Sequence, residues 1–174
     1  MSAATSLTHL LLGTNMGNRC GYLQFAQEMI QQNIGTICRY SPVYETSPWG
    51  YTQQADFLNQ ALVVQTHCSP EQLLTLLQEI ETKAGRQRLM HWGPRTLDID
   101  IIAIENKVIC SERLQVPHPA LAQRRFVLQP LAEIAPEWQH PLSRLTYRQM
   151  LASCRDNTIV KKYDCPLIFD CKRI

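Results

Sequence analysis

Two aspartates stand two residues apart in the most strand-like segment of the chain, residues 97–104. Alternate side chains of a strand leave the same face, so Asp98 and Asp100 are expected on one face and Ile99 on the other. Carboxylates this close repel each other unless a cation lies between them, so replacing either one by Asn is expected to raise the stability of the ligand-free protein slightly. Their hard oxygens suit Mg²⁺, which usually binds one or two carboxylates, several waters and polyphosphate oxygens. The alternative interpretation is the solvated face of a half-buried strand.

Arginine and aromatic residues gather in the loop directly before this pair, and they favour the metal site over the solvated face. The candidate residues of the loop are Arg86, Arg88, His91, Trp92 and Arg95. Guanidinium groups beside a carboxylate pair can neutralise phosphate charge that a metal ion does not reach. The sequence contains no G-x-x-x-x-G-K-[ST] motif, which excludes a P-loop. The pattern therefore predicts a nucleotide held by metal, arginine and loop backbone.

The segment that contains the pair carries a specific family resemblance. Its residues Trp92-Gly93-Pro94-Arg95-Thr96-Leu97-Asp98-Ile99-Asp100-Ile101-Ile102 resemble the signature of the 6-hydroxymethyl-7,8-dihydropterin pyrophosphokinase family of folate biosynthesis. The similarity extends over roughly residues 7 to 140, through Gly13-Thr14-Asn15, Tyr44-Glu45-Thr46, Phe57-Leu58-Asn59, Val116-Pro117-His118 and Arg124-Arg125-Phe126. The resemblance implies a ferredoxin-like fold and transfer of the β,γ-pyrophosphoryl group of ATP to the primary alcohol of the reduced hydroxymethylpterin, with release of AMP.

The resemblance also implies a role for each matched residue. Asp98 and Asp100 would hold two Mg²⁺ ions on the phosphates of the co-substrate ATP, and Arg86 and Arg95 would be the catalytic arginines. The implied ATP-binding residues are Arg86, Arg88, Trp92, Arg95, Ile101, Arg113, His118 and Arg124. The implied pterin-binding residues are Thr46, Ser47, Trp49, Phe57, Asn59 and Phe126.

Several of these residues have a simpler interpretation when they are taken singly. Asn59 could be a structural hydrogen-bond partner, Phe126 could be core, and His118 could be a structural histidine. Glu81, which the resemblance places in support of the site, would by default be a solvated charge. Trp49 stands where the family usually has an aliphatic residue.

Two other functions are compatible with parts of the pattern. A metal-dependent nucleotidyltransferase also places two aspartates on a strand, but its product would be AMP joined to the acceptor. A ferredoxin-like RNA-binding module would need aromatic residues on its sheet, whereas aromatic residues make up only 7% of the chain and the acidic pair would repel phosphate. We therefore expect an ATP-dependent enzyme that does not act on nucleic acid.

The elements that position these residues follow the order strand, helix, strand, strand, helix, strand. A capping box at Ser69 with Pro70 at the first helical position starts the second helix, and Gly85 ends it. The expected strands cover residues 8–12, 34–44 with a bulge or edge at Pro42, 57–66 and 97–104, and the expected helices cover 22–30 and 70–84, with short helices within 117–136 and 145–152. This order predicts a ferredoxin-like α+β sandwich with a mostly antiparallel sheet covered by helices on one face.

The length and composition of the chain limit how many domains it can form. The 174 residues carry a net charge of +2 and are 45% hydrophobic, which suits one compact domain and argues against a dedicated nucleic-acid binder. We expect a single domain over residues 1–160, a C-terminal tail of unassigned role over 161–174, and a monomer. No apolar run is long enough to cross a bilayer.

The seven cysteines form no C-x-x-C pair, and no secretion signal is recognisable. We therefore expect a cytoplasmic protein whose cysteines have no assigned chemistry. A disulfide among Cys154, Cys165 and Cys171 is the less favoured alternative.

Overall fold

A six-stranded antiparallel sheet forms the centre of the protein in a computed structural model that describes residues 5–87 and 93–166. The strands are β1 (Ser6–Thr14), β2 (Gly35–Tyr40), β3 (Val43–Thr46), β4 (Phe57–Thr66), β5 (Asp98–Ile104) and β8 (Val160–Tyr163). Their order is β5-β1-β4-β3-β8, and β2 also pairs with β4. The expected strand over 34–44 is thus two strands on β4, interrupted at Ser41-Pro42, where the Ser41 hydroxyl accepts a hydrogen bond from the Ala61 N–H.

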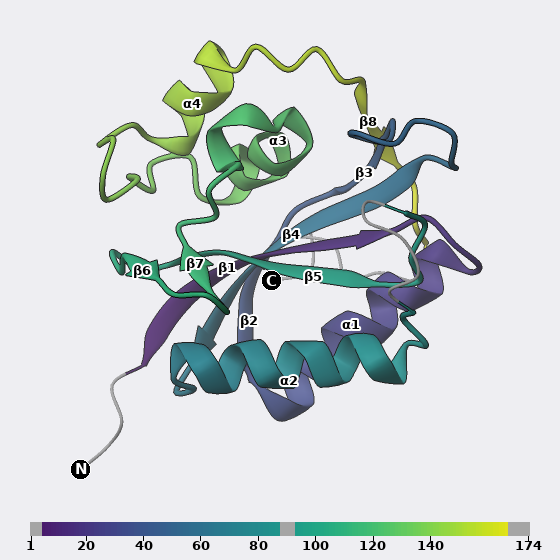
Figure 1. The fold of residues 1–174 in the computed structure, drawn as a ribbon, viewed down its shortest axis with the longest axis horizontal. Helices are drawn as coiled ribbons and strands as arrows, with labels where there is room; N and C mark the ends of the chain where they lie inside the picture. Colours follow the sequence, from purple (N-terminus) through teal and green to yellow (C-terminus); the bar gives the residue numbers. More distant parts are fainter. Residues whose placement is uncertain (1–4, 88–92, 167–174) are drawn as a thin grey trace.

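Helices cover both faces of this sheet (Figure 1). They are α1 (Arg19–Asn33), α2 (Pro70–Lys83), α3 (Arg125–Ile134) and α4 (Tyr147–Ser153), and a small hairpin joins β6 (Ile109–Cys110) to β7 (Gln115–Val116). Leu10 and Leu12 of β1 belong to the core beneath α1 and α2, whereas Leu11 belongs to the core beneath α3 and α4. The α+β class with an antiparallel sheet is confirmed.

The expectation of helices on one face only is wrong, because it holds for α1 and α2 but not for α3 and α4. The apolar run Leu10-Leu11-Leu12 is buried throughout, as in a strand covered on both sides. The second helix begins as its signals predict: Ser69 and Gln72 form a capping box before Pro70, and the helix ends just before Gly85, whose φ is +75°.

Strand β8 brings the C-terminal region into the sheet. It pairs with β3, so residue 160, where we expected the domain to end, is the first residue of a strand. Lys162 of β8 also forms an ion pair with Glu133 of α3 at 3.0 Å. The start of the expected tail therefore covers the β3 edge, which would otherwise present unpaired backbone groups.

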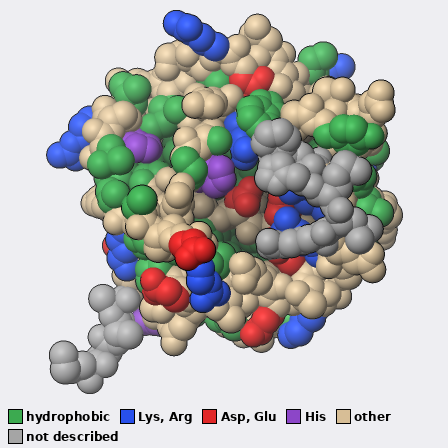
Figure 2. All heavy atoms as spheres, in the orientation of Figure 1, with side chains coloured by type: hydrophobic (Ala, Val, Ile, Leu, Met, Phe, Trp, Pro, Cys, Tyr) green, Lys and Arg blue, Asp and Glu red, His purple; other side chains and the backbone are tan. Residues whose placement is uncertain are grey.

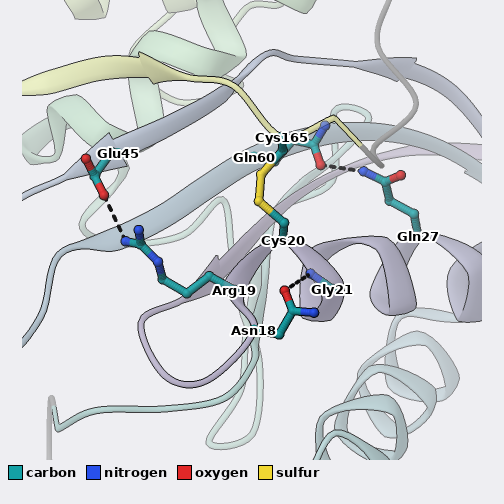
Figure 3. The surroundings of a disulfide bond; sticks show 8 residues. All are labelled: Asn18, Arg19, Cys20, Gly21, Gln27, Glu45, Gln60 and Cys165. Carbon is teal, nitrogen blue, oxygen red and sulfur yellow. Dashed lines mark hydrogen bonds and ion pairs between the residues drawn. A yellow bond between two sulfur atoms is a disulfide. The ribbon is translucent and has the colours of Figure 1, made fainter.

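A disulfide joins this C-terminal region to the first helix, and it corrects our expectation for the cysteines. Cys20 at the start of α1 is bonded to Cys165, just beyond β8 (Figure 3). Neither Cys154, which is free, nor Cys171, which lies outside the described residues, is the partner. Beside the bond, Arg19 pairs with Glu45 at 2.9 Å and lies 5.3 Å from the ring centre of Tyr163. The two cysteines are 145 residues apart, so no local pattern pointed to the pairing.

A buried histidine lies between the sheet and α4. The Nδ1 atom of His9 in β1 is 2.7 Å from the Tyr147 hydroxyl, and the Trp138 ring contacts the imidazole edge-on, with 5.4 Å between ring centres. Burial lowers the pKa of His9 to about 4, and the positive charge of Arg39 adds to the effect. The imidazole is therefore neutral at pH 7.

None of the helices within 5–87 and 93–166 is long and apolar enough to span a membrane.

His9 should make the protein acid-sensitive. Its folded pKa lies below the ordinary value of 6.5, so the unfolded chain binds the extra proton first and stability falls as the pH drops from 6.5 towards 4. A shift of this size corresponds to a loss of about 3 kcal/mol at pH 4. We expect urea unfolding at several pH values to show this loss in the wild type, and His9→Asn to lack that part of the pH dependence. Parallel pH profiles for the two proteins would contradict the assignment.

Candidate active site

The predicted site residues meet in one cavity of about 490 Å³. In Figure 2 acidic and basic side chains lie side by side in a hollow on this face. The predicted residues that line the cavity are Thr46, Ser47, Trp49, Phe57, Asn59, Arg86, Arg95, Asp98, Asp100, Ile101, Arg113, His118, Arg124 and Phe126. Arg88 and Trp92, which we also predicted for the ATP site, lie outside the described residues, as does His91.

The register of the sheet brings the two predicted halves of the site together. Gly13 of β1 is opposite Asn59 of β4 on one side and opposite Asp98 of β5 on the other. A Cβ at position 13 would lie 3.1 Å from the Asn59 side-chain oxygen, a contact tighter than most real ones. The glycine therefore leaves room for the amide and keeps it near the carboxylates, although these residues are far apart in the sequence.

Asp98 is held by both predicted catalytic arginines. One Nη1 hydrogen bond from Arg86 reaches Oδ1 of Asp98 and one from Arg95 reaches Oδ2, each at 2.5 Å. Arg86 also pairs with Glu81 of α2, and a Glu81 oxygen accepts a hydrogen bond from the Ile99 N–H at 2.8 Å. Burial alone would lower the pKa of Arg86, but Asp98 and Glu81 raise it overall. Glu81 is buried, so its default interpretation as a solvated charge is wrong.

Asp100 has a different electrostatic environment from its neighbour. Burial, and next the negative charge of Asp98, raise its pKa to about 7, although Arg124 and Arg95 act in the opposite direction. The expected gain in stability on neutralising an aspartate therefore applies to Asp100. It does not apply to Asp98, because losing that carboxylate would leave two partly buried guanidinium groups without their partner.

The donor set of this pair fits a magnesium ion that also binds polyphosphate. No group of three or more His, Cys, Asp or Glu side chains in the described part of the chain could hold a metal by itself. Mg²⁺ on a nucleotide needs only one or two carboxylates, since water and phosphate supply the other ligands. Burial and the charge of Asp98 raise the pKa of Asp100, and a dication bound at the pair would stabilise both carboxylates in their charged form.

Aromatic rings and a buried amide form the other end of the cavity. Asn59 is 3% exposed, and its Nδ2 donates a hydrogen bond to the Thr46 hydroxyl at 2.6 Å. The guanidinium carbon of Arg124 lies 4.7 Å from the ring centre of Trp49 and 5.9 Å from that of Phe126. Arg124, which we predicted for the nucleotide, thus stacks on two residues that we predicted for the pterin, so the two expected subsites meet at this side chain.

His118 lies in the same cavity in its neutral form. Burial, and next the charge of Arg124, lower its pKa to about 4. Its Nδ1 accepts a hydrogen bond from the Ala120 N–H at 3.2 Å, which places the ring proton on Nε2. The imidazole can therefore donate one hydrogen bond from Nε2 at neutral pH.

Sequence reasoning missed part of the cavity wall. The lining residues that we did not predict include Leu74, Gln78, Glu112, Leu114 and Gln115. Leu74 and Gln78 precede Glu81 on α2 by seven and three residues, so helical spacing from Glu81 could have indicated them. The other three belong to the turn and second strand of the β6–β7 hairpin, next to the predicted residue Arg113.

This cavity has carboxylates and arginines at one end and aromatic rings with a buried amide at the other, which suits an enzyme that transfers a phosphorus-containing group from a nucleotide to a planar heterocyclic substrate. The model of the family described as 7,8-dihydro-6-hydroxymethylpterin-pyrophosphokinase (HPPK) matches residues 9–136. The chain therefore belongs to this family.

Individual relatives agree with the family match. The chain is 45% identical over 130 residues to a 2-amino-4-hydroxy-6-hydroxymethyldihydropteridine pyrophosphokinase of Bacillus subtilis, with 74% of this chain and 78% of the relative covered. It is 37% identical to the protein of the same name from Aquifex aeolicus, covering 91% of this chain and 96% of the relative.

A solved structure supports the fold. The Plasmodium falciparum HPPK-DHPS crystal structure with pteroate superposes with a TM-score of 0.73 at 17% identity, covering 88% of this chain. This chain spans 45% of the solved one.

Proposed function

We propose that this protein transfers the pyrophosphoryl group of ATP to 6-hydroxymethyl-7,8-dihydropterin, giving AMP and the pterin diphosphate, a step of folate biosynthesis. The observation that carries the proposal is the pairing of Gly13 with both Asn59 and Asp98. This register places a buried amide suited to a heterocycle edge next to carboxylates and arginines suited to magnesium and phosphate. The family membership supports the same reaction.

The residues of the cavity would have different roles in the reaction. Asp98 and Asp100 would hold two Mg²⁺ ions, which supply charge neutralisation on the ATP phosphates when bound. Arg86 and Arg95 are within reach of the same phosphates and would exchange their pairing with Asp98 for phosphate oxygens. The substrate hydroxyl is the nucleophile, so the protein supplies mainly position and electrostatic stabilisation.

The remaining cavity residues orient the two substrates. Asn59 and the backbone near Thr46 would bind the pterin edge, with Phe57, Phe126 and Trp49 on its ring faces. Ile101 and Arg113 would contact the nucleotide, together with neutral His118 as a hydrogen-bond donor. Arg124 stands between the two groups and would hold phosphate while it packs on the aromatic rings.

Product analysis tests this function against the alternative. Incubation of the protein with ATP, Mg²⁺ and the reduced hydroxymethylpterin should yield AMP and pterin diphosphate on chromatography. A nucleotidyltransferase would release pyrophosphate and join AMP to the pterin, and formation of ADP or no turnover would contradict the proposal.

We further propose that the enzyme is a cytoplasmic monomer, which sizing chromatography and cell fractionation would check.

Replacing Asn59 should weaken binding of the pterin far more than binding of the nucleotide. Asn59→Ala removes the amide and leaves its partners in a buried site unpaired, so we expect pterin binding to weaken by about 1 to 3 kcal/mol, roughly 5- to 150-fold in Kd. Calorimetric titration with each ligand separately measures the two effects. Asn33→Ala, a change at an exposed helix end where the amide donates to the Met29 carbonyl, is the control. Equal losses for both ligands would mean that Asn59 supports only the fold.

A further inference from the structure

Asp156 joins the segment after α4 to the start of α3. Its Oδ2 atom accepts a hydrogen bond from the Arg125 N–H at 2.8 Å, and its main-chain carbonyl accepts one from the Arg125 Nε, also at 2.8 Å. Its Oδ1 atom accepts hydrogen bonds from the Thr158 N–H at 2.9 Å and from the Thr158 hydroxyl. Both carboxylate oxygens of Asp156 therefore have donors, and one of these donors belongs to α3.

Helix α3 has no capping side chain of its own, and Asp156 takes that place. The residue before the helix is Arg124, whose side chain makes no capping hydrogen bond. The Arg125 N–H is among the first N–H groups of α3, which have no partner within a helix, and the helix dipole also favours a carboxylate at this end. An acceptor 31 residues further along the chain therefore fixes the first turn of α3.

The two neighbours of Arg125 in the sequence, Arg124 and Phe126, line the cavity, whereas Arg125 and Asp156 do not. The Nε atom of Arg124 is buried and has no hydrogen-bond partner among residues 5–87 and 93–166. The guanidinium carbon of Arg124 lies 5.9 Å from the centre of the Phe126 ring. The direction of this side chain therefore depends on ring packing and on the backbone from which it starts, because no hydrogen bond holds its Nε.

We propose that Asp156 is a positioning residue that orients Arg124 in the nucleotide site by holding the peptide group between Arg124 and Arg125. The role of Arg124 towards the nucleotide rests on the function proposed above. The carbonyl of this peptide group accepts hydrogen bonds from the N–H groups of Val127 and Leu128, each at 3.1 Å, and its N–H donates to Asp156. Without the carboxylate the N–H loses its partner, and the Arg124 side chain is free to turn away from the phosphates.

Calorimetric titration with a non-hydrolysable ATP analogue and Mg²⁺ tests this role without turnover. Arg124→Ala should weaken binding of the analogue by about tenfold or more, and Asp156→Ala should weaken it by about fivefold. Adding Asp156→Ala to Arg124→Ala should change the Kd by less than about twofold, because the residue through which Asp156 acts is then absent. Multiplied losses in the double variant, or a wild-type Kd in either single variant, would overturn the proposal.

Thr146→Ala is the control for a general loss of stability. Thr146 caps α4 through its hydroxyl, which accepts a hydrogen bond from the Gln149 N–H at 3.2 Å, and it does not line the cavity. Thr146→Ala and Asp156→Ala each remove a helix cap, so both should lower the urea midpoint, but only Asp156→Ala should change the Kd of the analogue. Equal losses of affinity in the two variants would mean that Asp156 supports only the fold.

Thr158→Val keeps the test decisive if Asp156→Ala folds poorly. It removes the hydroxyl that donates to Oδ1 of Asp156 but keeps the N–H and nearly the same shape, so the analogue should bind about threefold more weakly. This loss should also disappear when Arg124→Ala is present. An unchanged Kd in folded Thr158→Val would overturn the positioning role.

Product analysis tests the proposed function separately, because the titration contains no pterin and no reaction. A wild type that binds the analogue but forms no pterin diphosphate would overturn the function alone. Normal product formation, together with an analogue Kd that does not respond to Asp156→Ala, would overturn the positioning role alone.

Discussion

Asp98→Asn and Asp100→Asn should each lower turnover by at least about 100-fold at saturating ATP and Mg²⁺, because a neutral amide is a much poorer ligand than a carboxylate for a hard dication. Both side chains line the cavity on one face of β5. Steady-state measurement of AMP release gives the effect. The solvated-face interpretation of the pair predicts wild-type turnover for both variants, so that outcome would remove the metal site. Asp164→Asn, an exposed aspartate beyond β8, is the control.

The stability of the same two variants should change in opposite directions. Asp100→Asn should stabilise the ligand-free protein by on the order of 1 to 2 kcal/mol near neutral pH, because burial and Asp98 disfavour the charge that the substitution removes. Asp98→Asn should destabilise it, because Arg86 and Arg95 would lose their shared partner. Urea unfolding without ligand measures both. Changes of the same sign would contradict the role of the arginine pairing.

Arg95→Ala should lower kcat by roughly 10²- to 10³-fold, the typical cost of losing one group that stabilises developing charge in a transition state. The same change should reduce the Mg²⁺ concentration needed for half-maximal activity, because the guanidinium that competes with the cation for Asp98 is gone. Arg95→Lys should recover only part of the rate, since an ammonium keeps the charge but not the two-pronged geometry.

The control for Arg95 is another arginine that pairs with a carboxylate but lies outside the cavity. Arg148 of α4 pairs with Glu137 at 2.5 Å, and both side chains are largely exposed, so Arg148→Ala should leave kcat and the Mg²⁺ requirement unchanged. An Arg95→Ala enzyme with unaltered kcat would show that the pairing with Asp98 is only structural. A higher Mg²⁺ requirement would contradict the competition between arginine and cation.

The sequence by itself determined the features that depend on near neighbours. Alternation placed Asp98 and Asp100 on one face of a strand, and the capping residues at Ser69 and Gln72 located the start of α2. The β-branched and apolar run from Phe57 to Thr66 has the bounds that its composition predicts. Such patterns succeed because strand alternation, capping and helix propensity act over a few residues.

Only the tertiary structure decided which distant groups meet. Gly13 lies between Asn59 and Asp98 because β1 pairs with both β4 and β5 in one register, and a shift of one residue would separate them. The same dependence on packing explains why Glu81 is buried against Arg86 and why α3 and α4 cover the second face. The Cys20–Cys165 bond follows from the pairing of β8 with β3, which carries the residues after β8 to the start of α1, although these segments share no local signal. Pairing register and burial depend on the whole fold, so a linear pattern could supply the chemical groups of this site but not their arrangement.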